Sequence, residues 1–147
     1  MKRFGFNLEK ILKLRKFSEE QAKNELGKAL GILAGIENNI KLNAQTRYNA
    51  SQKRFSSVST NHLNPESSLN SIIQWDLYIA RLDQEKEELL EKAAQAELVV
   101  EEKREIYMNA SRDLKVMEKL KEKQFAQYKK EYQAHEIKTM DDLYRAR

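Results

Sequence analysis

Residues 56–71 read SSVSTNHLNPESSLNS and contain the only proline of the chain, Pro65. Small polar residues crowd this stretch, whereas long runs of mixed apolar and charged residues lie on both sides of it. Asn64 followed by Pro65 is typical of a helix start, with asparagine as the N-cap and proline at the first helical position. The stretch therefore predicts a turn at about residues 59–64 and a second helix that starts near residue 65.

Upstream of this turn, apolar residues recur in alternating steps of four and three, which is the heptad pattern of a coiled-coil helix. We expect this first helix at about residues 4–58, and we call its heptad positions the first seam. The thirteen positions of the first seam, nine of them apolar, are Leu8, Leu12, Arg15, Glu19, Ala22, Leu26, Ala29, Leu33, Ile36, Ile40, Asn43, Arg47 and Ala50.

Downstream of the turn, the same spacing defines a second seam and predicts a helix at about residues 65–140. The fourteen positions of the second seam, twelve of them apolar, are Ile72, Trp75, Ile79, Leu82, Lys86, Leu89, Ala93, Ala96, Val100, Lys103, Tyr107, Ala110, Leu114 and Met117. Two apolar stripes joined by a short turn bury each other most simply, so residues 1–147 are predicted to form an all-α, long two-helix antiparallel coiled-coil hairpin as a single domain.

The two predicted helices differ in length, so part of the second one is left without a partner. The step pattern slips after Met117, where Phe125, Tyr128 and Tyr132 continue it with an extra step of four. This aromatic C-terminal region is therefore a candidate surface for another protein.

Composition supports long helices and excludes several classes of protein. The 147 residues include one proline, four glycines and no cysteine, 34% of them are charged, and the mean hydropathy is −0.81. The absence of cysteine excludes disulfides and thiolate metal sites. Charged residues interrupt the apolar N-terminus, and no run approaches the roughly 20 apolar residues of a membrane span. We therefore expect a soluble, cytoplasmic protein with no direct membrane insertion.

Charge is distributed unevenly along the chain. Residues 1–17 hold six bases and one acid, whereas residues 83–105 hold nine acids and four bases. Residues 112–147 hold ten bases and seven acids. In a hairpin the two basic termini would lie together.

No arrangement of residues in the sequence predicts catalysis. The only histidines, His62 and His135, have no neighbouring base or nucleophile, and no phosphate-binding or dinucleotide motif is present. We predict no catalytic residues, no metal site and no cofactor, and hence no enzyme. Binding to nucleic acid is disfavoured, because the acidic middle of the chain would repel phosphate.

Two further features have a structural and a functional interpretation. Three glycines, Gly27, Gly31 and Gly35, recur at a spacing of four. Three explanations are open: local drift of the sequence, close packing on the chain's own second helix, or close approach of another helix. Trp75 and Tyr78 either close the hairpin near its turn or serve as an anchor for a partner. For both features the structural interpretation is favoured.

The opening of the chain resembles the FliJ family of the bacterial flagellar export apparatus. The resemblance is carried by FGFNLEKILKLR at residues 4–15, by EEQAKNELGKA at residues 19–29, and more weakly by WDLYIARL at residues 75–82. It implies an antiparallel coiled-coil stalk similar to the central shaft of rotary ATP synthases. It also implies three partners: the export ATPase ring (FliI-like), the export gate protein (FlhA-like) and export chaperones.

The resemblance also implies a location at the flagellar base, on the cytoplasmic face of the inner membrane, and two sets of contact residues. Those expected at the ATPase ring are Phe4, Phe6, Leu8, Lys10, Lys13 and Arg15. Those expected at the export gate are Trp75, Leu82, Lys86, Leu89 and Ala93. The alternatives are a generic coiled-coil adaptor, the equivalent stalk of a virulence type III secretion system, and a helical arm that binds nucleic acid.

Overall fold

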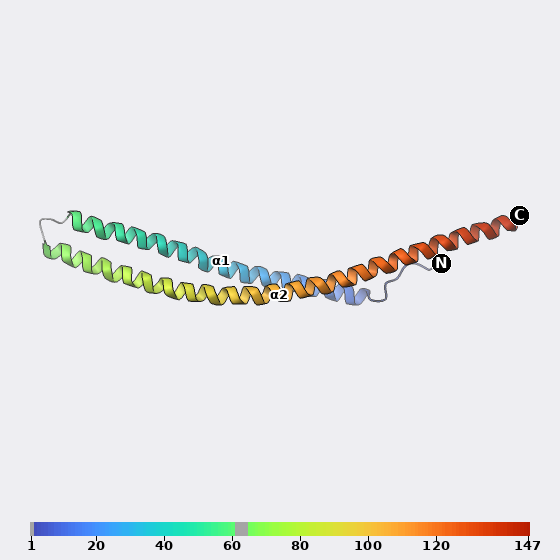
Figure 1. The fold of residues 1–147 in the computed structure, drawn as a ribbon, viewed down its shortest axis with the longest axis horizontal. Helices are drawn as coiled ribbons and strands as arrows, with labels where there is room; N and C mark the ends of the chain where they lie inside the picture. Colours follow the sequence, from blue (N-terminus) through green and yellow to red (C-terminus); the bar gives the residue numbers. More distant parts are fainter. Residues whose placement is uncertain (1, 61–64) are drawn as a thin grey trace. The chain divides into compact units, whose positions relative to one another are not determined.

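The computed structural model describes residues 2–60 and 65–147, and these residues form two helices (Figure 1). Helix α1 runs over Glu9–Thr60 and helix α2 over Pro65–Arg145. The two helices pack against each other in antiparallel orientation, and the described residues include no strand. The all-α hairpin predicted from the sequence is therefore confirmed.

Contacts divide the chain into two compact units. The terminal unit consists of Met1–Glu25 and Arg104–Arg147, and the central unit consists of Leu26–Lys103. Each unit contains one piece of α1 and one piece of α2. Each unit therefore has its own two-helix core.

The helix bounds differ from the expected ones at three places. Helix α1 begins at Glu9 and not near residue 4, because Gly5 disfavours a helix and the backbone nitrogen of Glu9 bonds the carbonyl of Phe6 in a turn (3.1 Å). Residues 59–60 of the expected turn belong to α1. Helix α2 begins at Pro65 as expected and continues to Arg145, whose positive charge suits a helix C-terminus. The rest of the expected turn, including the predicted N-cap Asn64, lies outside the described residues.

The two seams predicted from heptad spacing are the faces at which the helices meet. Every position of the first seam is buried or half-buried except Arg15 and Arg47, and every position of the second seam is buried or half-buried except Lys86. Leu12, only 2% exposed, is the largest fully buried side chain among the described residues. The core is therefore one layer of side chains between two helices, as a coiled-coil pattern predicts.

Two ion pairs fix the register of the helices in the central unit. The Nε of Arg47 donates to Asp83 at 2.6 Å, and the Nε of Arg54 donates to Asp76 at 2.6 Å. Arg54 follows Arg47 by seven residues, and Asp76 precedes Asp83 by seven residues. The two ion pairs therefore agree on one antiparallel register. The hydrogen bond that Arg47 donates to Asp83, and then the charge of Asp83, raise the pKa of the Arg47 guanidinium above its ordinary value. These exposed pairs specify alignment more than they add stability.

Asn43 is the polar side chain in the core of the central unit. Its Nδ2 donates to the carbonyl of Leu82 at 3.1 Å, whereas its Oδ1 is buried and has no hydrogen-bond partner. A buried acceptor without a partner lowers stability, but a single polar residue in a coiled-coil core favours one register over others. Asn43 thus contributes specificity at a cost in stability.

We expect Asn43→Leu to raise the free energy of unfolding by about 1–2 kcal/mol, because it removes the unpaired acceptor and buries apolar surface. The midpoint of urea denaturation measures this change. Asn39→Leu, at an exposed position one turn away, is the matched control and should have little effect. A clear loss of stability in Asn43→Leu would show that the hydrogen bond to Leu82 outweighs the unpaired oxygen.

The three spaced glycines do not serve packing between α1 and α2. Gly27, Gly31 and Gly35 are exposed, and a Cβ atom built on any of them would meet nothing within 4 Å. Close packing on the chain's own second helix is therefore the wrong explanation for their spacing.

Candidate protein-binding surfaces

The residues before α1 lie against the aromatic side chains of α2 in the terminal unit. The Phe4 ring packs on Phe125 with centroids 5.1 Å apart and on Tyr128 with centroids 5.4 Å apart. The Tyr128 hydroxyl donates to the backbone carbonyl of Lys2 at 2.8 Å. The Tyr128 ring also neighbours that of Tyr132, at 6.2 Å. The N-terminal segment thus contacts Phe125 and Tyr128, whereas Phe125 and Tyr132 keep exposed surface.

The apolar residues expected at the ATPase ring are engaged within the chain. Phe6 is buried, and Phe4 and Leu8 are half-buried. These side chains hold the N-terminal segment on α2, which is one reason why the first residues are not helical. Only parts of Phe4 and Leu8 are available to another protein.

The basic residues expected at the ATPase ring divide into two groups. Lys10 and Lys13 are exposed and form no ion pair with any described residue. The guanidinium of Arg15 donates to Asp113 across the helix pair at 2.8 Å. The charge of Arg15 is thus paired within the hairpin. Of the three basic residues expected at the ring, Lys10 and Lys13 remain without an ion pair among the described residues.

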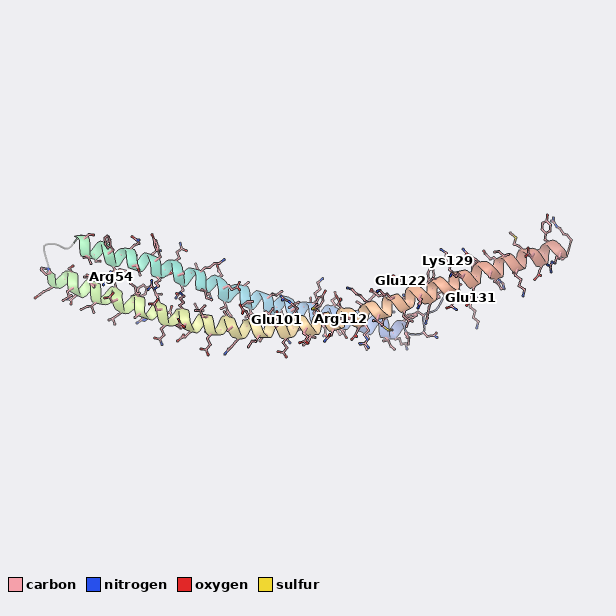
Figure 2. All side chains as sticks on the ribbon, viewed as in Figure 1. Arg54, Glu101, Arg112, Glu122, Lys129 and Glu131 are labelled. Atoms are coloured by element: carbon pink, nitrogen blue, oxygen red, sulfur yellow. The ribbon has the colours of Figure 1, made fainter. Side chains whose placement is uncertain are left out.

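The last part of α2 has no helix beside it in the terminal unit. Every residue from Lys129 to Arg147 is exposed, and Lys129 and Glu131 project from this single helix (Figure 2). Within it, Met140, Leu143 and Tyr144 expose large apolar side chains at helical spacing. The charge of Glu136, followed by its hydrogen bond, raises the pKa of Tyr132 above its ordinary value. The sequence predicted that the end of α2 has no partner helix. The prediction named only aromatic residues there and did not include Met140 and Leu143.

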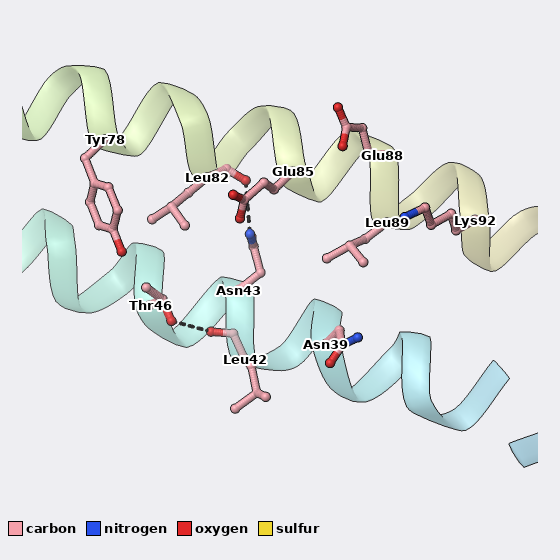
Figure 3. A pocket seen from close by; sticks show the side chains of 10 residues that line it. All are labelled: Asn39, Leu42, Asn43, Thr46, Tyr78, Leu82, Glu85, Glu88, Leu89 and Lys92. Carbon is pink, nitrogen blue, oxygen red and sulfur yellow. Dashed lines mark hydrogen bonds between the residues drawn. The ribbon is translucent and has the colours of Figure 1, made fainter. Parts of the chain in front are cut away.

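A shallow groove lies between α1 and α2 in the central unit (Figure 3). Its floor is formed around Asn43 and Leu82, and its rim carries the carboxylates of Glu85 and Glu88. The residues that line it are Asn39, Leu42, Asn43, Thr46, Tyr78, Leu82, Glu85, Glu88, Leu89 and Lys92. The groove combines apolar side chains with acidic ones, which suits contact with another protein.

The residues expected at the export gate are not one exposed stripe. Leu82 and Ala93 are buried against α1, as their place on the second seam predicts, so neither offers much surface to another protein. Leu89 is half-buried at the groove and Lys86 is exposed. The α1 side of the groove was missed, because Asn39, Leu42 and Thr46 lie off the first seam and Asn43 was counted only as a seam position.

Trp75 lies one turn before the groove in α2. It is half-buried, its ring meets that of Tyr78 edge-on at a centroid distance of 6.0 Å, and the Lys53 ammonium lies 5.9 Å from its centre. The contact with Lys53 joins the two helices of the central unit. Trp75 thus packs in the hairpin, as the structural interpretation predicts, and contacts Tyr78 of the groove.

Searches for other kinds of site give no candidate among the described residues. No group of three or more histidine, aspartate or glutamate side chains in residues 2–60 and 65–147 is arranged to hold a metal ion. None of the helices in that part of the chain is long and apolar enough to cross a membrane.

Comparison with known proteins identifies one family. The family model described as Flagellar FliJ protein matches residues 4–147. No curated protein and no solved structure matches the chain. The matched range covers both units and so includes every candidate surface described above.

Proposed function

The chain belongs to the FliJ family of flagellar proteins, and on this premise we propose that it acts as a stalk at the export ATPase. Membership makes it a non-enzymatic component of the flagellar export apparatus. In the proposed function the hairpin binds the ATPase ring, promotes its assembly and activity, and links it to the export gate and to export chaperones. It would work at the flagellar base, on the cytoplasmic face of the inner membrane.

The terminal unit is the proposed ATPase-binding end. The observation that carries this assignment is the pairing of two basic chain ends in one unit, with Lys10 and Lys13 free of ion pairs among the described residues. Free charges steer a partner and tolerate movement, whereas a large apolar interface would hold it fast. The exposed apolar residues of the single helix, such as Met140 and Leu143, would supply the remaining contact area.

The groove of the central unit is the proposed gate-binding site. Tyr78 and Leu89 offer apolar surface there, and Trp75 exposes an edge beside it. Aromatic side chains at the centre of a small depression are favoured anchors for protein partners. Lys86 is exposed on α2 between Leu82 and Leu89 and would contribute charge at the rim.

We expect Lys10→Glu combined with Lys13→Glu to slow association with the export ATPase while the fold stays intact. Both side chains point away from the core, so only the charge of the outer face changes. Stopped-flow or surface-based kinetics at several salt concentrations would measure the association rate. The defect should shrink as salt rises, because salt screens exposed charges.

Lys41→Glu combined with Arg81→Glu is the matched control, since it makes the same charge change at exposed positions of the central unit. The control should associate at close to the wild-type rate. If the Lys10 and Lys13 variant associates as fast as the control at low salt, the ATPase is not captured through this basic end.

A further inference from the structure

The outer face of the first three turns of α1 exposes large apolar side chains among lysines. Leu14 is 62% exposed and Phe17 is 58% exposed. By contrast, Leu12, two residues before Leu14, is fully buried. Lys10, Leu14 and Phe17 are spaced by four and three residues, so they are neighbours on one face of the helix. Lys13 lies one turn before Phe17 and borders the same face. Packing against α2 gives no reason for apolar residues here.

The positive charge of this region is not neutralised within the chain. Its single acid, Glu9, lies 3.0 Å from the Lys121 ammonium, and Arg15 is paired with Asp113. Lys2, Arg3, Lys10 and Lys13 form no ion pair with any described residue. The basic surface is therefore available to an anionic partner.

We propose that this face binds the surface of an anionic lipid bilayer. The face in question comprises Lys10, Lys13, Leu14 and Phe17, with Lys2 and Arg3 from the segment before the helix. A helix that lies in the membrane interface combines a lysine-rich polar surface with phenylalanine and leucine that enter the boundary between headgroups and acyl chains. The lysines are attracted to anionic headgroups within a Debye length of the surface. The contact is interfacial and requires no membrane span.

Two comparably exposed apolar residues, Ile32 and Leu98, lack this combination. Ile32 is 63% exposed in the uncharged stretch 29–36, and Leu98 is 72% exposed in the acidic stretch 83–105. A polyanion without exposed bases, such as heparin or the backbone of duplex DNA, would use the lysines but would gain nothing from Leu14 and Phe17. The pairing of exposed apolar side chains with free lysines is what favours a bilayer.

The inference does not rest on the proposed function. Lys10 and Lys13 take part in both proposals, whereas Leu14 and Phe17 belong only to this one. The test therefore substitutes Leu14 and Phe17 and contains lipid but no export protein. Its failure would count against bilayer binding and not against binding of the export ATPase.

The experiment is sedimentation of the full-length chain with large vesicles of phosphatidylglycerol and phosphatidylcholine, and with vesicles of phosphatidylcholine alone. Wild type should bind the anionic vesicles and not the neutral ones, and binding should weaken as salt rises. Leu14→Gln combined with Phe17→Gln should raise the lipid concentration for half-maximal binding by at least about tenfold, because two apolar side chains no longer enter the interface. Ile32→Gln combined with Leu98→Gln, the matched control, should bind as wild type does.

Circular dichroism shows whether each variant is folded, and a heparin column gives the affinity for a polyanion without lipid. Both double variants should elute from heparin with wild type, since neither changes a charge. Two results would overturn the proposal. One is equal binding of wild type to anionic and neutral vesicles, or to neither. The other is unchanged binding of the Leu14 and Phe17 variant to anionic vesicles, which would make the face a charged surface for polyanions in general.

Discussion

Replacing Leu12 by alanine is expected to lower the free energy of unfolding by about 2–5 kcal/mol, the largest effect of any single substitution in the terminal unit. Leu12 is 2% exposed and lies at the centre of a core that is only one side chain thick. Few neighbours can move to fill the cavity, because α1 and α2 are the only elements there. Urea denaturation followed by circular dichroism measures the loss.

Leu14→Ala is the matched control for this prediction, since the two leucines lie on the same helix two residues apart. Leu14 is largely exposed, so its truncation should change stability by less than about 0.5 kcal/mol. Hydrogen exchange should place the effect of Leu12→Ala in residues 9–25 and 104–128. Equal stability of the two variants would contradict the packing of the terminal unit.

Replacing Leu82 by alanine is expected to cost about 2–5 kcal/mol in the central unit, and its result separates a core residue from a docking residue. Leu82 is 5% exposed, and its backbone carbonyl accepts the hydrogen bond from Asn43. Truncation would leave a cavity beside the buried Asn43 amide. The melting temperature and the urea midpoint measure the change.

Leu77→Ala is the control for Leu82, because Leu77 is exposed on the same helix. It should leave the melting temperature close to that of the wild type. If Leu82→Ala melted at the wild-type temperature but bound the export gate weakly, Leu82 would be a contact residue, and its burial against α1 would not describe the protein in solution.

The helix pairing could be predicted from the sequence because a coiled coil requires apolar side chains at the same positions of every seven residues. Apolar side chains must recur where the partner helix passes, so Leu12, Leu82 and Val100 were placed correctly in the core by spacing alone. Arg15 and Arg47 interrupt the first seam without harm, because each reaches an aspartate on α2.

The start of α1 was not readable in the same way. The helix was expected to begin near residue 4, but Gly5 and the contacts of Phe4 with Phe125 and Tyr128 favour a non-helical conformation of this segment. Those contacts join residues more than 120 positions apart in the sequence. No local pattern specifies them.

The candidate surfaces were predicted only in part. Lys10 and Lys13 lie off the first seam, and the structure leaves both exposed. The groove depends on which residues of α1 face α2, and of its α1 residues the seam included only Asn43. Surfaces made by two helices require the register between them, which the ion pairs of Arg47 and Arg54 reveal in the structure.

In the proposed function this hairpin is a stalk that promotes the activity of the flagellar export ATPase. The rate of ATP hydrolysis by the export ATPase of the same organism, measured with increasing amounts of the full-length chain, tests this proposal. We expect a rate that rises and then saturates, with a smaller rise at low salt for Lys10→Glu combined with Lys13→Glu. A rate that stays constant when the folded wild-type chain is in large excess over the ATPase would contradict it.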